Sequence, residues 1–166
     1  DLTPPALITA TSQSGNYTYH GYWKNSSQTA IAVNPITTTL LALAANTNPS
    51  LITSSLDLTS ATTSVKTIFA DVFSAASVNS SSLDFISTTF TADHTGLDLV
   101  LDSIQTSVNT SGTVTLTNKL NGTNLSVSTN SVSAMPFNAQ AVTLMQNAPI
   151  KTCSNVLSGL TSSKLD

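Results

Sequence analysis

The segment ATTSVKTIFADVFSAA, residues 61–76, carries the clearest helical pattern in this chain of 166 residues. Its apolar side chains recur at spacings of three and four residues, so a helix would place them on one face. They are Val65, Ile68, Phe69, Val72, Phe73 and Ala76. Because such a face is stable only when other apolar side chains cover it, the segment predicts a helix packed into the core of a domain.

Two more helices are predicted on either side of this segment. Asn34 followed by Pro35 marks a helix start, because asparagine accepts from a free amide and proline loses nothing at the first helical position. That helix should end between residues 46 and 49. The other begins after Thr95-Gly96, with acids in its early turns. The expected common core is Leu40, Leu43, Val65, Ile68, Phe69, Val72, Phe73, Leu97, Val100, Leu101 and Ile104.

Two stretches alternate with the period of β-strands. Residues 6–23 predict a hairpin, and residues 30–33 could add a third short strand. Residues 113–129 predict a second hairpin around Asn121-Gly122. Since an isolated hairpin is marginal in water, we expect both hairpins to join in one antiparallel sheet on one side of the helices. The alternative is that residues 6–11 pair with a neighbouring domain or subunit.

The predicted fold class is α+β, with a mainly helical body, a small antiparallel sheet from the N-terminal strands and a second hairpin near 113–129. We predict one domain over residues 1–166, with a β-rich opening (1–33), a helical part (34–105), the hairpin (113–129) and C-terminal helices (137–160). The last two helices are expected near 139–146 and 151–160. Because the chain starts at Asp1 without a methionine or a charged leader, we expect a processed part of a larger protein.

The composition indicates where the protein works. Only 8% of its residues are charged, whereas an ordinary soluble domain has about one quarter, and about a third are serine or threonine. A surface wetted by hydroxyls and amides favours an extracellular or cell-surface location. The five lysines are dispersed, so we expect no nucleic-acid partner. The longest apolar run, residues 40–45, is far shorter than the roughly 20 residues of a transmembrane segment.

Catalytic motifs are missing from the sequence, so we predict no enzyme activity and no cofactor. A hydrolase would require His20 or His94 beside an aspartate and a hydroxyl. The densest acidic segment offers Asp93, Asp98 and Asp102 as oxygen ligands for a metal ion. Its spacing is not that of an EF-hand, and a loop whose aspartates start a helix is the favoured interpretation.

One aromatic cluster is a candidate ligand-binding site, consisting of Tyr17, Tyr19, Tyr22 and Trp23. Exposed rings beside polar neighbours commonly bind sugars or protein partners. On a strand, Tyr17 and Tyr19 share one face while Tyr22 lies on the other, so part of the cluster should pack inward.

Residues 30–38 (AIAVNPITT) and 83–98 (LDFISTTFTADHTGLD) resemble the helical region of large secreted lipoproteins of proteobacteria. In those proteins the region often follows a carboxypeptidase-regulatory-like β-sandwich, and the opening DLTPPAL (1–7) looks like the exit from such a domain. The resemblance implies a secreted or surface-attached bacterial protein, and it assigns no site residues.

The leading functional hypothesis is a non-enzymatic extracellular module, structural or adhesive, of a bacterial surface protein or assembly. Its partners would be other surface proteins or further copies of the chain. The alternative is a domain that binds a carbohydrate or another ligand through the Tyr17–Trp23 aromatic cluster.

Overall fold

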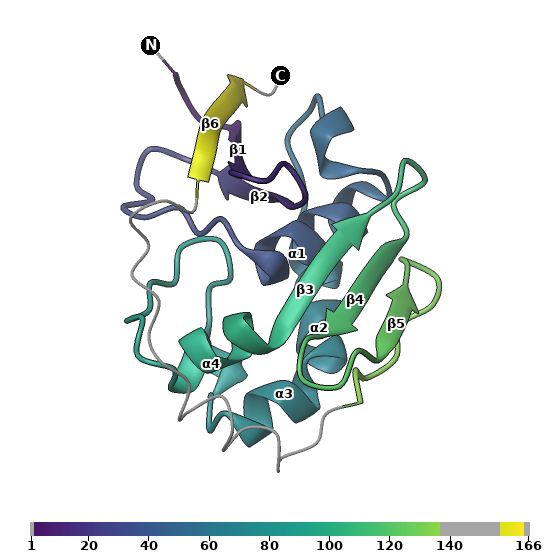
Figure 1. Cartoon of the computed structure of the whole chain (residues 1–166). Coiled ribbons are helices and arrows are strands. Elements are labelled where there is room, and N and C mark those ends of the chain that lie inside the picture. The colour runs from purple at the N-terminus through teal and green to yellow at the C-terminus, as the bar shows by residue number, and fades with distance from the viewer. Residues whose placement is uncertain (1, 137–156, 165–166) are drawn as a thin grey trace.

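The structure is a computed structural model that describes residues 2–136 and 157–164. The described residues form two three-stranded antiparallel sheets and four α-helices (Figure 1). The first sheet has the order β2-β1-β6, with β1 (Ala6–Ser12), β2 (Thr18–Trp23) and β6 (Leu157–Lys164). The second has the order β3-β4-β5, with β3 (Ile104–Val108), β4 (Val114–Asn118) and β5 (Asn124–Val127). The helices are α1 (Pro35–Ala45), α2 (Thr59–Ile68), α3 (Ala70–Ala75) and α4 (Gly96–Ser103), with 3-10 turns η1 (Pro49–Leu51) and η2 (Ser80–Ser82).

The prediction of a mainly helical body is wrong. The longest described helix has 11 residues, and the two sheets contribute as much regular structure as the α-helices. Two strands were missed. Ile104 was assigned to a helix that ends at Ser103, after which the chain continues as β3. Residues 157–160, predicted as helix, lie in β6, while the rest of the predicted C-terminal helices falls outside the described residues.

The two predicted hairpins form as β1–β2 and β4–β5, but they do not share a sheet. Strand β1 pairs with β2 from Ala6↔Trp23 to Thr11↔Thr18, and its other edge pairs with β6. Residues 6–11 therefore find their partners within the chain, as expected, but not in the 113–129 hairpin. That hairpin instead gains β3 as its third strand. Residues 30–33 form no strand and cross closely over Gly21, where a Cβ atom would lie 2.5 Å from the Ala32 carbonyl oxygen.

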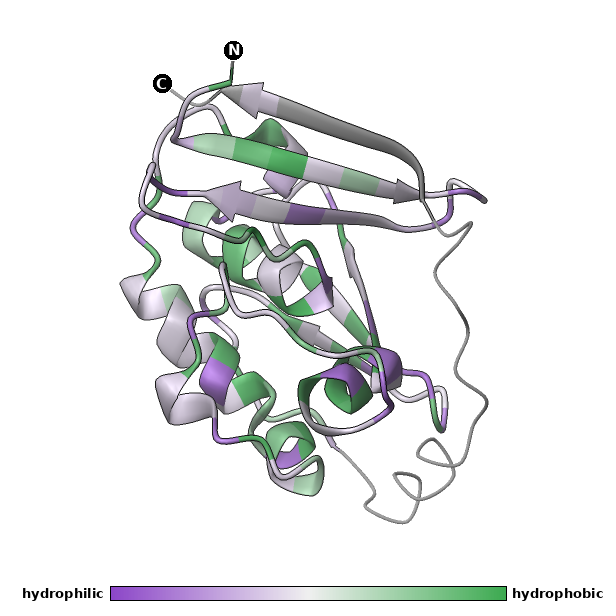
Figure 2. Ribbon diagram, turned by 90° about the vertical axis from the view of Figure 1, so that its left-hand side faces the viewer, coloured by the Kyte–Doolittle hydropathy of each residue, from purple (hydrophilic) through white to green (hydrophobic). Residues whose placement is uncertain are grey.

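Helix α1 is the central element of the molecule. It contacts β2, α2 and β3, and every residue from Pro35 to Leu43 is buried. Figure 1 shows it between the two sheets, and in Figure 2 β2 is the strand of the first sheet nearest the helices. The predicted helix start is confirmed, because the Asn34 side chain accepts from the amides of Ile36 and Thr37 at 2.9 Å.

Buried threonines distinguish α1 from an ordinary core helix. The hydroxyls of Thr38 and Thr39 donate to the carbonyls of Asn34 and Pro35, one turn earlier. Because this satisfies the donor within the helix, the methyl groups can pack in the core without leaving a polar group unpaired. The Thr38 hydroxyl also accepts from the His20 amide at 2.8 Å, which ties the outer edge of β2 to α1.

Residues 61–76 form two helices rather than one, but their apolar face is buried as predicted. Phe69 lies between α2 and α3, and backbone hydrogen bonds continue through it, from Phe69 to Val65 and from Phe73 to Phe69. Of the eleven residues expected in the core, nine are buried, while Leu97 and Leu101 pack partly buried against the same cluster. None of the helices that the structure describes is long and apolar enough to span a membrane.

Candidate functional site

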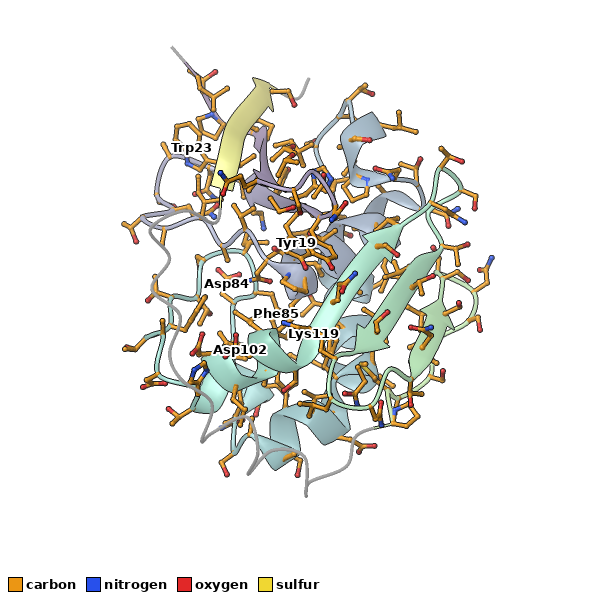
Figure 3. The ribbon with its side chains drawn as sticks, in the orientation of Figure 1. Tyr19, Trp23, Asp84, Phe85, Asp102 and Lys119 are labelled. Carbon is orange, nitrogen blue, oxygen red and sulfur yellow. The ribbon has the colours of Figure 1, made fainter. Side chains whose placement is uncertain are left out.

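The four aromatic residues of the predicted cluster do not form one surface. Tyr22 is 1% exposed and belongs to the core, where its Oη accepts from the Leu56 amide at 3.2 Å. Tyr19 and Trp23 are half-buried and lie toward opposite ends of β2 (Figure 3). Tyr17, just before β2, is 39% exposed. Tyr17 is therefore the ring of this cluster that is most open to a ligand.

Tyr17 borders a cavity of about 400 Å³, which we call the Tyr17 hollow. It lies where segments of both sheets meet α1 and η1. Its walls come from four parts of the chain: Asn16, Tyr17, Thr18 and His20; Thr38; Asn48 and Ser50; and Thr106, Ser107 and Val108. Tyr17 also borders a second, shallower depression, which residues 12–14 line.

Local hydrogen bonds fix the turn that presents Tyr17. The backbone closes between Ser12 and Tyr17, with the Ser12 amide 2.8 Å from the Tyr17 carbonyl. The Tyr17 amide in turn donates to the Ser12 hydroxyl at 3.1 Å. Gly15 has φ +71°, a left-handed conformation that glycine adopts without the strain of a side chain. The ring is therefore held on a short, defined turn.

The opposite wall is held by Asn48. Its Oδ1 accepts from the Ser50 amide at 3.0 Å, which caps η1, and its Nδ2 donates to the Val108 carbonyl at 2.8 Å. This one side chain therefore joins the turn η1 to β3. Below it, the Thr106 hydroxyl donates to the Pro35 carbonyl at 3.2 Å, which joins β3 to α1.

His20 forms part of the floor and is uncharged at neutral pH. It is 4% exposed, its Nδ1 lies 3.1 Å from the Thr9 hydroxyl, and burial lowers its pKa to about 4. No aspartate or lysine lines the Tyr17 hollow among the described residues. The hollow is thus neutral, and His20 has no acidic partner there to support the hydrolase hypothesis.

The acidic segment gathers His94, Asp98 and Asp102 on one side of α4. His94 Nδ1 lies 2.5 Å from Asp102 Oδ2 and 4.0 Å from Asp98 Oδ2. Three ligand atoms, one from each residue, lie within 4.8 Å of one another. Two of the predicted metal ligands therefore converge, with His94 in place of Asp93. The spacing of Asp98 and Asp102 places them on successive turns of α4, whereas His94 precedes the helix with φ +58° and its approach depends on the loop.

The same groups also organise the start of α4. Asp98 Oδ2 accepts from the amides of Asp93 and His94 at 2.8 and 2.7 Å. Asp93 accepts from the hydroxyl and amide of Thr95, and these hydrogen bonds lower the pKa of the Asp93 carboxyl. His94 Nε2 is shielded from solvent. This geometry favours a structural role, because a shielded nitrogen cannot reach a substrate.

Comparisons of the chain with protein-family models, with curated proteins and with solved structures found no match. The resemblance to proteobacterial lipoproteins stays a prediction.

Proposed function

We propose that this chain is a non-enzymatic, extracellular adhesive module of a bacterial surface protein, and that it binds a neutral saccharide in the Tyr17 hollow. The observation that carries the proposal is an exposed tyrosine ring beside an uncharged cavity lined with amides and hydroxyls. A sugar ring has an apolar C–H face that can stack on an aromatic ring, and hydroxyls that pair with amide and hydroxyl side chains.

The size and rigidity of the cavity support this ligand class. Small-molecule sites usually measure about 300–1,000 Å³, and the Tyr17 hollow measures about 400 Å³. Asn48 and Thr106 are already held by hydrogen bonds to neighbouring backbone, so a ligand would meet groups in fixed positions. Pre-organised groups lose less conformational entropy on binding.

The rest of the proposal is supported by composition and by the titratable groups. A chain with 8% charged residues and abundant hydroxyls departs from the roughly one quarter charged residues of ordinary soluble domains, which supports an extracellular setting. Reaction chemistry needs a titratable group within reach of the substrate. His20 is held neutral without an acid in the hollow, and His94 Nε2 is shielded.

A panel of neutral glycans tests the proposal, with Tyr17→Ala as the diagnostic variant and Phe90→Ala as the matched control. Phe90 is also an exposed ring, at 46%, but it does not line the hollow. We expect Tyr17→Ala to weaken binding about three- to tenfold, from the lost aromatic contact, and Phe90→Ala to leave it unchanged. Trp23 fluorescence should stay silent, because Trp23 does not line the hollow. Failure of every neutral glycan to bind, or equal binding by both variants, would remove the proposal.

Self-assembly or docking of another surface protein is the second candidate function. Strand β6 stands at the edge of the first sheet, and no described strand pairs with its outer edge. Such an edge can accept a strand from another chain. We expect the mass measured by analytical ultracentrifugation to rise with concentration if copies pair. A constant monomer mass would leave only a different surface protein as partner.

A further inference from the structure

A second cavity, which we call the Lys24 pocket, lies on another part of the molecule. Residues of three loops, 24–29, 56–58 and 83–87, form it together with Leu40 of α1 and with Thr59 and Thr62 of α2. Its volume is about 540 Å³, within the usual range of ligand sites. It shares no lining residue with the Tyr17 hollow, so the two cavities can be tested independently.

Gln28 fixes the loops around this pocket. Its Oε1 accepts from the Lys24 amide at 2.8 Å. Its Nε2 lies 2.9–3.0 Å from three carbonyl oxygens, those of Tyr22, Ala30 and Ile86. The 24–29 loop is thereby tied both to β2 and to the 83–87 loop. The pocket is thus formed before any ligand arrives.

Apolar side chains underlie one part of the pocket, whose accessible lining is otherwise mostly polar. Leu40 and Phe85 are buried, and Leu56 packs against the same core cluster. The ring of Phe85 stacks on that of Phe73, with centroids 6.0 Å apart and an interplanar angle of 11°. Because Phe73 belongs to α3, the pocket floor is anchored in the core. An apolar group on a ligand would cover this part of the lining favourably, while polar groups would meet the rest.

The rim of the pocket is charged in a protein that has few charges. Of the 13 charged side chains in the sequence, Lys24, Asp57 and Asp84 line this pocket, giving a net charge of −1. Hydrogen bonds from Thr59 lower the pKa of Asp57, with a smaller contribution from nearby Lys24. Asp84 Oδ2 accepts from the Ser87 hydroxyl at 2.6 Å and its Oδ1 from the Ile86 amide at 3.3 Å, and no lysine in the described part of the chain forms an ion pair with it. One carboxylate on the rim is therefore left for a cation.

We propose that the Lys24 pocket binds a small organic ammonium, a primary amine attached to an apolar body, with Asp84 as its main charged contact. The apolar body would lie against the partly buried Leu56, above the buried Leu40 and Phe85, and the ammonium would reach the rim. The positive charge of Lys24 would repel the ammonium group, and this repulsion would weaken amine binding. This site is separate from the proposed saccharide site.

Isothermal titration with three ligands of similar size tests the charge requirement. The probes are 2-phenylethylamine, neutral 2-phenylethanol and anionic 3-phenylpropanoate. We expect the amine to bind most tightly and the anion least. The Asp84→Asn variant should weaken amine binding about two- to fivefold, as for an exposed ion pair, while Asp71→Asn should not. Asp71 is an exposed aspartate of α3 outside the pocket, so it controls for the change in net charge.

The Lys24→Gln variant gives a prediction of opposite sign. The Lys24 side chain makes no hydrogen bond to the described residues, and Lys24 contacts Gln28 through its backbone amide. Removing its charge should tighten amine binding by a similar factor, whereas general damage to the fold would weaken it. The proposal is overturned if the three probes bind equally, if no probe binds saturably, or if Asp84→Asn and Asp71→Asn behave alike. None of these outcomes bears on Tyr17.

Discussion

His20 is a buried polar residue that links three elements of the core through hydrogen bonds. Its backbone amide donates to Thr38 and its ring pairs with Thr9, so β1, β2 and α1 meet at this residue. The ring must stay neutral, because burial disfavours the charged form. Nothing in the local sequence distinguished His20 from His94, since burial depends on elements distant along the chain.

The lowered pKa of His20 predicts a loss of stability in mild acid. An unfolded histidine takes up a proton near pH 6.5, whereas His20 in the folded protein does so only near pH 4. Between these values the unfolded state binds more protons, so the free energy of unfolding falls as the pH is lowered. We expect this contribution to be about 2 kcal/mol, discounted for partial solvation, and constant above about pH 6.5.

Urea unfolding of the parent and of His20→Gln, from neutral pH down to about pH 4, measures this contribution. The difference in unfolding free energy between the two proteins should shrink as the pH falls, because the variant has no group to protonate there. Parallel pH profiles would show that His20 is not buried as a neutral ring.

The role of Asn34 as a helix cap follows most directly from the sequence, because proline comes next. Its side chain caps α1 through two amides, and it is itself buried. Asn34→Ala should lower the free energy of unfolding by about 1–2 kcal/mol, measured by urea denaturation. Asn34→Asp keeps the acceptor oxygen and should retain most of that stability. Equal destabilisation by both variants would mean that the cap is not what stabilises this turn.

The elements with strong local patterns were predictable, and those defined by distant pairing were not. The 61–76 face and the Asn121-Gly122 hairpin follow from neighbouring residues alone. Strand β3 was missed because Leu97, Leu101 and Ile104 fit helical spacing, and only pairing with β4 shows that the chain is extended from Ile104 onward. Strand β6 pairs with β1 across about 150 residues of sequence, so no local signal could place it.

The buried face of α2 and α3 gives a stability prediction at this scale. Phe73 packs between Phe69 and Phe85, with ring centroids 6.0 Å from each. Phe73→Ala should lower the free energy of unfolding by about 3–5 kcal/mol, because the cavity it leaves cannot fully close. Phe90→Ala removes an exposed ring and should cost far less. Thermal or urea unfolding that gave equal losses for the two variants would contradict the assignment of the buried face.

At the scale of the whole molecule, the Tyr17 hollow depends on the arrangement of both sheets around α1. Its walls come from residues 16–18, 20, 38, 48, 50 and 106–108. The aromatic pattern pointed to Tyr17, but Asn48 and Thr106 carry no motif, and they reach the site only because η1 and β3 pack beside α1. The division into two sheets could not be predicted from the sequence either, because it too depends on contacts between elements that are distant along the chain.

The most direct test of the account is a nuclear magnetic resonance titration of the labelled protein with neutral methyl glycosides. We expect saturable shifts confined to the Tyr17 hollow, including the amides of Tyr17, Asn48 and Ser107, with saturation transfer from the Tyr17 ring to sugar protons. Residues of the Lys24 pocket should not shift. Shifts that appear only elsewhere, or no shift at the hollow with any neutral glycoside, would contradict the proposed function.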